Sequence, residues 1–348
     1  MKFSAHKSIQ LAVLATTIAT VLGCQSLSEE IAQREAMQYG DKAEVGMLHA
    51  TVETTPVASN DDAADDPAIW IHPIDTTKSL ILGTDKKAGI AVYNLAGEQV
   101  QFLAYGLPNN VDIRQGVMGA DGLMDVAAFS DRADDSVGFL SVSESGVEHI
   151  ASFPVGEEPY GFCLGQSGVA TYAFVTYKTG LVEQYRVATK QDFSLTLHGR
   201  YQLASQLEGC VYDDVANVLF VGEEENAIWK FTSLEQAPIM LDQLGSNSGL
   251  AADIEGLAIY RGEQPYLVVS SQGNDSYALY DLNPPHAFVK RFRVVASGNI
   301  DGAQETDGLD ANATPMGERY PNGILVVQDG YNQDPSNKQN FKIIPANF

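Results

Sequence analysis

Short apolar runs alternate with polar turns along most of the chain. A unit of two apolar strands around a polar turn recurs six times, starting near residues 80, 124, 173, 218, 266 and 323. The runs are rich in β-branched and aromatic residues and show no sustained helical periodicity, which predicts strands. Intervals of 44 to 57 residues match the size of a propeller blade. We therefore predict an all-β fold, a six-bladed β-propeller.

Two sets of polar or charged residues accompany these units, with one residue of each set for every unit. One residue opens a short strand before each unit: Asp66, Asn109, Tyr160, Glu208, Glu255 and Asp307. Another stands where the next strand ends: Lys86, Arg132, Lys178, Glu224, Gln272 and Asp329. Adjacent antiparallel strands place the start of one beside the end of the next. Both sets should therefore surround one mouth of the central channel.

The charges of these residues divide by blade. The first three units supply Lys86, Arg132 and Lys178, whereas the last three supply mainly acids, with Asp65 and Asp253 nearby. Crowded carboxylates repel one another unless they are paired or bind a metal, and hard cations such as Ca²⁺ prefer many oxygen ligands. Calcium on one side and cationic side chains on the other would suit a multiply phosphorylated ligand.

Any one of these acids alone would be typical of a solvated turn, and only their repetition favours a site. The chain contains no Gly-x-Ser-x-Gly, His-Glu-x-x-His or Walker motif, and its six histidines are scattered. These features disfavour zinc or histidine-based nucleophilic chemistry. A net charge of −24 argues against a nucleic-acid partner.

The N-terminus has the features of an export signal. Lys2 and Lys7 precede an apolar stretch that ends at Cys24. The segment Val21-Leu-Gly-Cys24 resembles a bacterial lipoprotein box, so we predict a signal peptide at 1–23, a lipidated Cys24 with a tether at 24–50, and a propeller at 51–348. An ordinary cleaved signal is the alternative. We expect an exported cell-envelope protein, on the outer-membrane or periplasmic side or secreted, that meets a membrane only through this anchor.

Two further cysteines, Cys163 and Cys210, lie in neighbouring units. Export permits a disulfide. Their offsets within the repeat differ slightly, however, which favours opposite strand faces. We therefore expect two buried free thiols.

From about residue 53 to 341 the chain resembles the β-propeller phytase family. The motifs that carry this resemblance include Asp61-Asp-Ala-Ala-Asp-Asp-Pro-Ala-Ile-Trp70, Asn109-Asn-Val-Asp-Ile-Arg114, Glu223-Glu-Glu-Asn-Ala-Ile-Trp-Lys-Phe231 and Ala252-Asp-Ile-Glu-Gly-Leu257. The resemblance implies calcium-dependent release of phosphate from phytate, bound as its calcium complex, by metal-activated water. It leaves open another calcium-dependent propeller hydrolase, acting on lactones or phosphotriesters, and a non-catalytic propeller stabilised by calcium.

The resemblance also implies roles for individual residues. Metal-binding roles pass to Glu53, Asp65, Asp66, Glu208, Glu224, Asp253, Glu255 and Asp307, with Gln272 as a further candidate on the ring. Asp301, Gln328 and Asp329 match positions linked to calcium that supports the fold. Phosphate contacts pass to Lys86, Lys87, Arg132, Tyr160 and Lys178. We expect Glu208, Asp307, Lys86, Lys178 and Arg132 to take part in catalysis, in a protein that acts as a monomer.

Overall fold

The computed structural model describes residues 45–189, 193–333 and 337–348. The predicted signal peptide, Cys24 and most of the predicted tether lie outside these residues. The described part is all-β, apart from two single 3₁₀ turns at Thr76–Lys78 and Gln272–Asn274. Its helices are too short to cross a membrane.

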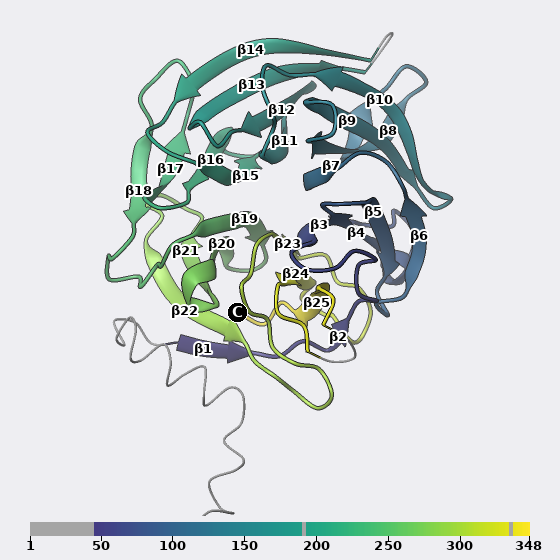
Figure 1. Ribbon diagram of the computed structural model, residues 1–348, viewed down its shortest axis with the longest axis vertical. Helices are drawn as coiled ribbons and strands as arrows, with labels where there is room; N and C mark the ends of the chain where they lie inside the picture. The colour runs from purple at the N-terminus through teal and green to yellow at the C-terminus, as the bar shows by residue number, and fades with distance from the viewer. Residues whose placement is uncertain (1–44, 190–192, 334–336) are drawn as a thin grey trace, which may run out of the picture. The chain divides into compact units, whose positions relative to one another are not determined.

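Six sheets surround a central axis, which confirms the predicted six-bladed β-propeller (Figure 1). We number the blades by the order in which their first strands occur along the chain. Blade 1 contains β3 (Ala64–Trp70), β4 (Leu80–Asp85), β5 (Gly89–Asn94) and β6 (Gln99–Leu103), and blade 2 contains β7 (Pro108–Met118), β8 (Leu123–Asp131), β9 (Ser136–Ser143) and β10 (Gly146–Pro154). Blade 3 contains β11 (Gly161–Ser167), β12 (Ala170–Thr176), β13 (Leu181–Ala188) and β14 (Ser194–Gln202), and blade 4 contains β15 (Leu207–Asp213), β16 (Val218–Glu223), β17 (Ala227–Phe231) and β18 (Ile239–Gln243). Blade 5 contains β19 (Ile254–Arg261), β20 (Pro265–Ser271), β21 (Ser276–Asp281), β22 (Phe288–Val294) and β1 (Val45–Leu48), and blade 6 contains β23 (Leu309–Asn312), β24 (Ile324–Asp329), β25 (Asn340–Pro345) and β2 (Val52–Glu53).

Both ends of the described chain are built into blades. β2 pairs antiparallel with β25, so an N-terminal and a C-terminal strand complete the same sheet and close the ring. β1 pairs in parallel with β22 at the edge of blade 5. Residues 45–48, which the sequence assigned to the tether, are therefore strand. Edge pairing uses backbone groups and needs no apolar pattern, which is why the sequence did not indicate it.

The core lies between neighbouring blades, so the strands are apolar on both faces. In β12, for example, Ala173 and Val175 pack with Phe139 of blade 2, while Phe174 packs with Leu219 of blade 4. Each blade thus buries one face against the preceding blade and one against the next.

Cys163 of β11 and Cys210 of β15 form a disulfide, with their Cα atoms 5.7 Å apart. The expectation of two free thiols was wrong. The difference in offset does place the two side chains on opposite faces of their own blades, but these are the faces that meet between blades 3 and 4. Both cysteines belong to the same buried cluster.

Candidate functional site at the channel mouth

The innermost strands carry β-bulges at the candidate site residues. In β3, β7, β15 and β19, the inner strand contains one residue more than the stretch of the partner strand with which it pairs. The extra residue lies between Ala64 and Pro67, Pro108 and Val111, Leu207 and Cys210, and Ile254 and Leu257. A bulge interrupts the alternation of side chains and redirects them. The bulged pairs are Asp65-Asp66, Asn109-Asn110, Glu208-Gly209 and Glu255-Gly256, so the chain changes direction at the predicted ring.

Glycine at the second position of a pair allows the blades to approach closely. A Cβ atom on Gly209 would lie 2.0 Å from the backbone oxygen of Glu255, and one on Gly308 would lie 2.3 Å from Asp66 Oδ1. Only a residue without a side chain fits there. The Glu-Gly and Asp-Gly pairs in the sequence thus mark points where the innermost strands of neighbouring blades lie very close together.

Asp65 occupies the position on the ring that the sequence assigned to Asp66. Asp65 is the first residue of its bulged pair, as Glu208 is, and it contacts Lys86. Asp66 follows it and accepts a hydrogen bond from the backbone N–H of Val111 in blade 2. Asp66 lines a cavity inside the channel with Asp112 and Asp310. Periodicity alone could not separate the two neighbours, because the bulge adds one residue to the strand.

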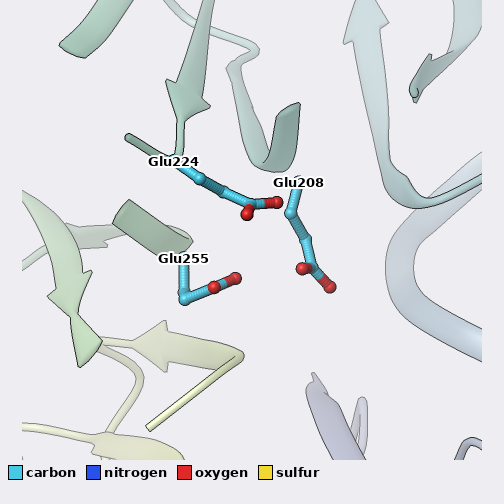
Figure 2. Close-up of side chains that lie close together, drawn as sticks. All are labelled: Glu208, Glu224 and Glu255. Carbon is cyan, nitrogen blue, oxygen red and sulfur yellow. The ribbon is translucent and has the colours of Figure 1, made fainter. Parts of the chain in front are cut away.

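Glu208, Glu224 and Glu255 form the acidic centre of the mouth. Figure 2 shows their side chains converging from β15, from the end of β16 and from β19, and one carboxylate oxygen of each lies within 4.8 Å of the others. All three residues are buried, and Glu255 Oε2 has no hydrogen-bond partner in the structure. This geometry offers several oxygen ligands to one cation.

The pKa values of these carboxyl groups reflect their crowding. Burial, followed by the charge of Glu208, raises the pKa of Glu255 well above its usual range. Burial raises the pKa of Glu224 to about 7, with Asp253 adding to the effect. Burial and the Asp65 carboxylate raise the pKa of Glu208. Each group would be easier to ionise beside a bound cation.

Lys86 supplies a positive charge beside this acidic centre. Its ammonium lies 3.2 Å from Asp65 Oδ2, 3.4 Å from Asp307 Oδ2 and 2.7 Å from Asp62 Oδ1. Burial opposes its charge, but the Asp65 and Asp307 carboxylates outweigh that effect and raise the pKa of Lys86. Gln272 Nε2 donates to the other oxygen of Asp307 at 2.6 Å. The ring residues of blades 1, 5 and 6 are thus connected.

The remaining basic residues lie next to the same group. The Lys178 ammonium stands 4.3 Å from the centre of the Tyr160 ring, and burial together with Glu208 raises the pKa of Tyr160. Arg132 Nη2 donates to the backbone oxygen of Lys86 at 3.3 Å. Lys87 differs from these residues, because its exposed ammonium donates to the backbone oxygen of Asn60.

Asp253 is half-buried beside the acidic centre. Burial, followed by the charge of Glu225, raises its pKa. Its backbone oxygen accepts a hydrogen bond from the N–H of Gln272.

A second acidic group lies at the closure of the ring and surrounds Lys342 of β25. The fully buried Lys342 ammonium lies 2.7 Å from Glu53 Oε2 and 3.1 Å from Asp329 Oδ2, and it also contacts Asp301. Asp329 is the last residue of β24, whereas Lys86, Arg132, Glu224 and Gln272 follow the last residue of their strands. Glu53, Asp301 and Asp329 therefore gather around a lysine and do not join the mouth group.

The side chain of Gln328 in β24 contacts the backbone of blades 6 and 1 at the mouth. Its Oε1 accepts from the backbone N–H of Asp307 at 2.9 Å, and its Nε2 donates to the backbone oxygen of Ala64 at 3.2 Å. Its side chain thus holds backbone at the site and is not directed at the carboxylates.

Sequence reasoning missed two contributors, Gln206 and Lys342. Gln206 donates to both carboxylate oxygens of Glu224, at 2.9 and 2.8 Å. Asn109, which the sequence placed on the ring, donates to Glu208 Oε1 at 2.6 Å. Lys342 gave one signal, a lysine inside the apolar run of β25. Gln206 gave no distinguishing signal, since an amide is common in loops and turns.

Comparisons with known proteins show the family to which the chain belongs. The family model described as Phytase matches residues 10–347. A 3-phytase of Bacillus subtilis (strain 168) is 40% identical over 318 residues, which cover 85% of this chain and 82% of the relative. A solved structure titled BBS1N in complex with ARL6DN, soaked with lead, is 14% identical with a TM-score of 0.48, covering 81% of this chain and 79% of that one.

Proposed function

The chain belongs to the phytase family and is a phytase, and we propose that it releases phosphate from phytate with calcium bound at the channel mouth. The observation that carries the proposal is the acidic centre of Glu208, Glu224 and Glu255 beside a basic group of Lys86, Arg132 and Lys178. Metal and ammonium charges together would hold neighbouring phosphates of one inositol ring.

The residues at the mouth fit a hard divalent cation. Three buried carboxylates approach each other, and Glu255 Oε2 and Asp65 Oδ1 are buried without a hydrogen-bond partner. Such oxygens are costly to bury unless something positive contacts them. Calcium prefers oxygen ligands of this kind and tolerates irregular geometry. We propose Glu208, Glu224, Glu255, Asp307 and Asp65 as its main ligands, with Asp253 and Gln272 at the margin.

The chain's own groups then have separate tasks. Bound calcium would neutralise phosphate and make water a better nucleophile. Lys86 lies at the junction of Asp65 and Asp307, where it can stabilise charge on the phosphoryl group. Arg132, Lys178 and Tyr160 border the same space and can hold a second phosphate, which would orient the ring. Glu208 and Asp307 can position the cation and accept a proton.

The overall charge favours the calcium complex of phytate as the substrate. A chain of net charge −24 repels a free polyanion. Phytate that arrives with bound calcium carries less negative charge, so the repulsion is smaller.

We also propose that the protein is exported and held by a lipid on Cys24. The Cys163–Cys210 disulfide is consistent with an oxidising compartment. Labelled palmitate should enter the wild-type protein in its native host and not the Cys24→Ser variant. Equal labelling of both would contradict the anchor.

A phosphate-release assay tests the function. The purified propeller should liberate inorganic phosphate from phytate in the presence of calcium, and excess chelator should abolish the release until calcium is restored. Release that is unaffected by chelator would refute the calcium requirement and leave the phytase activity standing. No release from phytate at any calcium concentration would refute the function itself.

A further inference from the structure

In three blades, a buried hydroxyl near the end of the second strand contacts the next blade. Each donates across the blade boundary to a backbone oxygen in the site segment of the next blade. Ser130 of β8 donates to Tyr160 at 2.9 Å, Thr176 of β12 to Glu208 at 2.7 Å, and Ser270 of β20 to Thr306 at 3.0 Å. All three hydroxyl residues have no exposed surface. The contacts thus connect blades 2 to 3, 3 to 4 and 5 to 6.

The other three blades have a different residue or a different partner at this position. Gln328 of β24 donates to the backbone oxygen of Ala64, which connects blade 6 to blade 1. Thr84 of β4 bonds to Asp66 within its own blade. In blade 4 the position is Gly222, where a Cβ would lie 3.0 Å from the backbone oxygen of Ile254. The hydroxyl contacts are therefore a feature of particular blade boundaries.

The Thr176 contact holds the peptide of a residue in the acidic centre. The Glu208 backbone oxygen is enclosed, because a Cβ on Gly161 would lie 1.7 Å from it and 2.2 Å from Thr176 Oγ1. At the other end of the same residue, Asn109 of blade 2 donates to the Glu208 carboxylate. Glu208 is thus held at both ends by blades other than its own.

We propose that Thr176 is a positioning residue for Glu208 in the reaction, an inference that rests on the proposed function. The Glu208 carboxylate lies among others that repel it, so its backbone needs a fixed attachment to keep it there. Loss of the hydroxyl removes the donor to that backbone oxygen and lets the Glu208 segment shift. Displacements of about 1 Å at such a site can reduce turnover by about 100-fold.

The test compares Thr176→Val, which keeps the shape and removes the donor, with Thr176→Ser, which restores it. Thr171→Val is the matched control, since Thr171 is a buried threonine at the other end of β12, paired with Gln166 and Val187. At saturating calcium we expect kcat for phytate to fall by about 10-fold to 100-fold in Thr176→Val. Thr176→Ser should recover most of it, and Thr171→Val should keep the wild-type kcat even if its Tm falls equally.

The inference is overturned if Thr176→Val, folded at the assay temperature, turns over phytate like the wild type, or if Thr176→Ser does not recover activity. If Thr176→Val fails to fold, Ser130→Ala decides, because that hydroxyl donates to the Tyr160 backbone oxygen and accepts from the backbone N–H of Asn110. A raised KM in the folded Ser130→Ala variant supports the arrangement, and an unchanged KM refutes it. Failure of the proposed function is a separate result, since the wild type and Thr171→Val would then release no phosphate.

Discussion

At the scale of single residues, the mouth depends on pairs of residues at which the innermost strands of four blades bulge, and in blades 4 and 5 the second residue of the pair is glycine. The positions of Glu208, Glu255 and Asp307 could be recognised from sequence, because a short strand opens on such a residue before each unit. The direction of each side chain could not, since a bulge reverses the alternation at this point. Asp65 and Asp66 show the consequence, because two adjacent aspartates serve the mouth and the channel interior respectively.

The neighbouring residues Lys86 and Lys87 allow a direct test of the role of a single side chain at the mouth. Lys86 lies between Asp65 and Asp307 and is mostly buried, whereas Lys87 is exposed and contacts a loop carbonyl. We expect Lys86→Met to lower kcat/KM for phytate by about 100-fold to 1,000-fold, the range seen when a charge-stabilising donor is lost.

Lys87→Met is the control, with a change below about fivefold, as expected for an exposed ion. Initial rates of phosphate release at several phytate concentrations measure both variants. Equal losses in the two would contradict the role assigned to Lys86.

At the scale of elements, strand spacing predicted the blades well, because each blade must bury two apolar faces and therefore repeats at a regular length. Features that depend on which faces meet were harder to predict. Cys163 lies on the face of blade 3 that packs against blade 4, and Cys210 lies on the face of blade 4 that packs against blade 3. The sequence comparison took opposite faces as evidence against a disulfide, and this led to the wrong expectation. The β1 pairing and the environment of Lys342 depend on contacts distant in sequence.

Lys342 of β25 should be essential to the closure of the ring. Its ammonium is the positive partner of Glu53, Asp301 and Asp329, and burial raises the pKa of Asp329 to about 6 even though Lys342 lowers it. Lys342→Met leaves buried carboxylates without a cation, and we expect it to cost about 3–5 kcal/mol of unfolding free energy. Urea denaturation in the presence of a chelator measures this.

The matching control is Lys290→Met on the exposed face of β22, which should change stability by less than about 1 kcal/mol. Calcium should restore part of the loss in Lys342→Met, because the vacated carboxylates can then bind it. A variant as stable as the wild type in chelator would show that Lys342 does not balance this group.

At the scale of the whole molecule, all six blades contribute residues to one mouth. The fold thereby places acidic side chains on one side of the mouth and basic side chains on the other. Blades 4 and 5 bring Glu208, Glu224 and Glu255 together, and blades 1 to 3 bring the cations to their border. The propeller thus concentrates like charges at its centre. The stability of the entire ring should therefore respond to the charge state of the mouth.

The pKa of Glu224 determines the direction in which stability should change with pH. Burial raises the pKa of Glu224 from 4.5 to about 7, so the folded protein holds this proton more tightly than the unfolded chain. Without divalent cations, this group should make stability fall as pH rises from about 4.5 to 7.

In Glu224→Gln that contribution is absent. We expect the variant and the wild type to have similar Tm values in chelator at pH 5, and the variant to have the higher Tm at pH 8. Calcium at pH 8 should reverse the order, since a charged carboxylate binds Ca²⁺ more tightly than a neutral amide does. Glu263→Gln, at an exposed position, should follow the wild type throughout. Thermal unfolding followed by circular dichroism measures all three proteins, and a Tm difference between Glu224→Gln and the wild type that stays the same at both pH values would contradict the electrostatic account of the mouth.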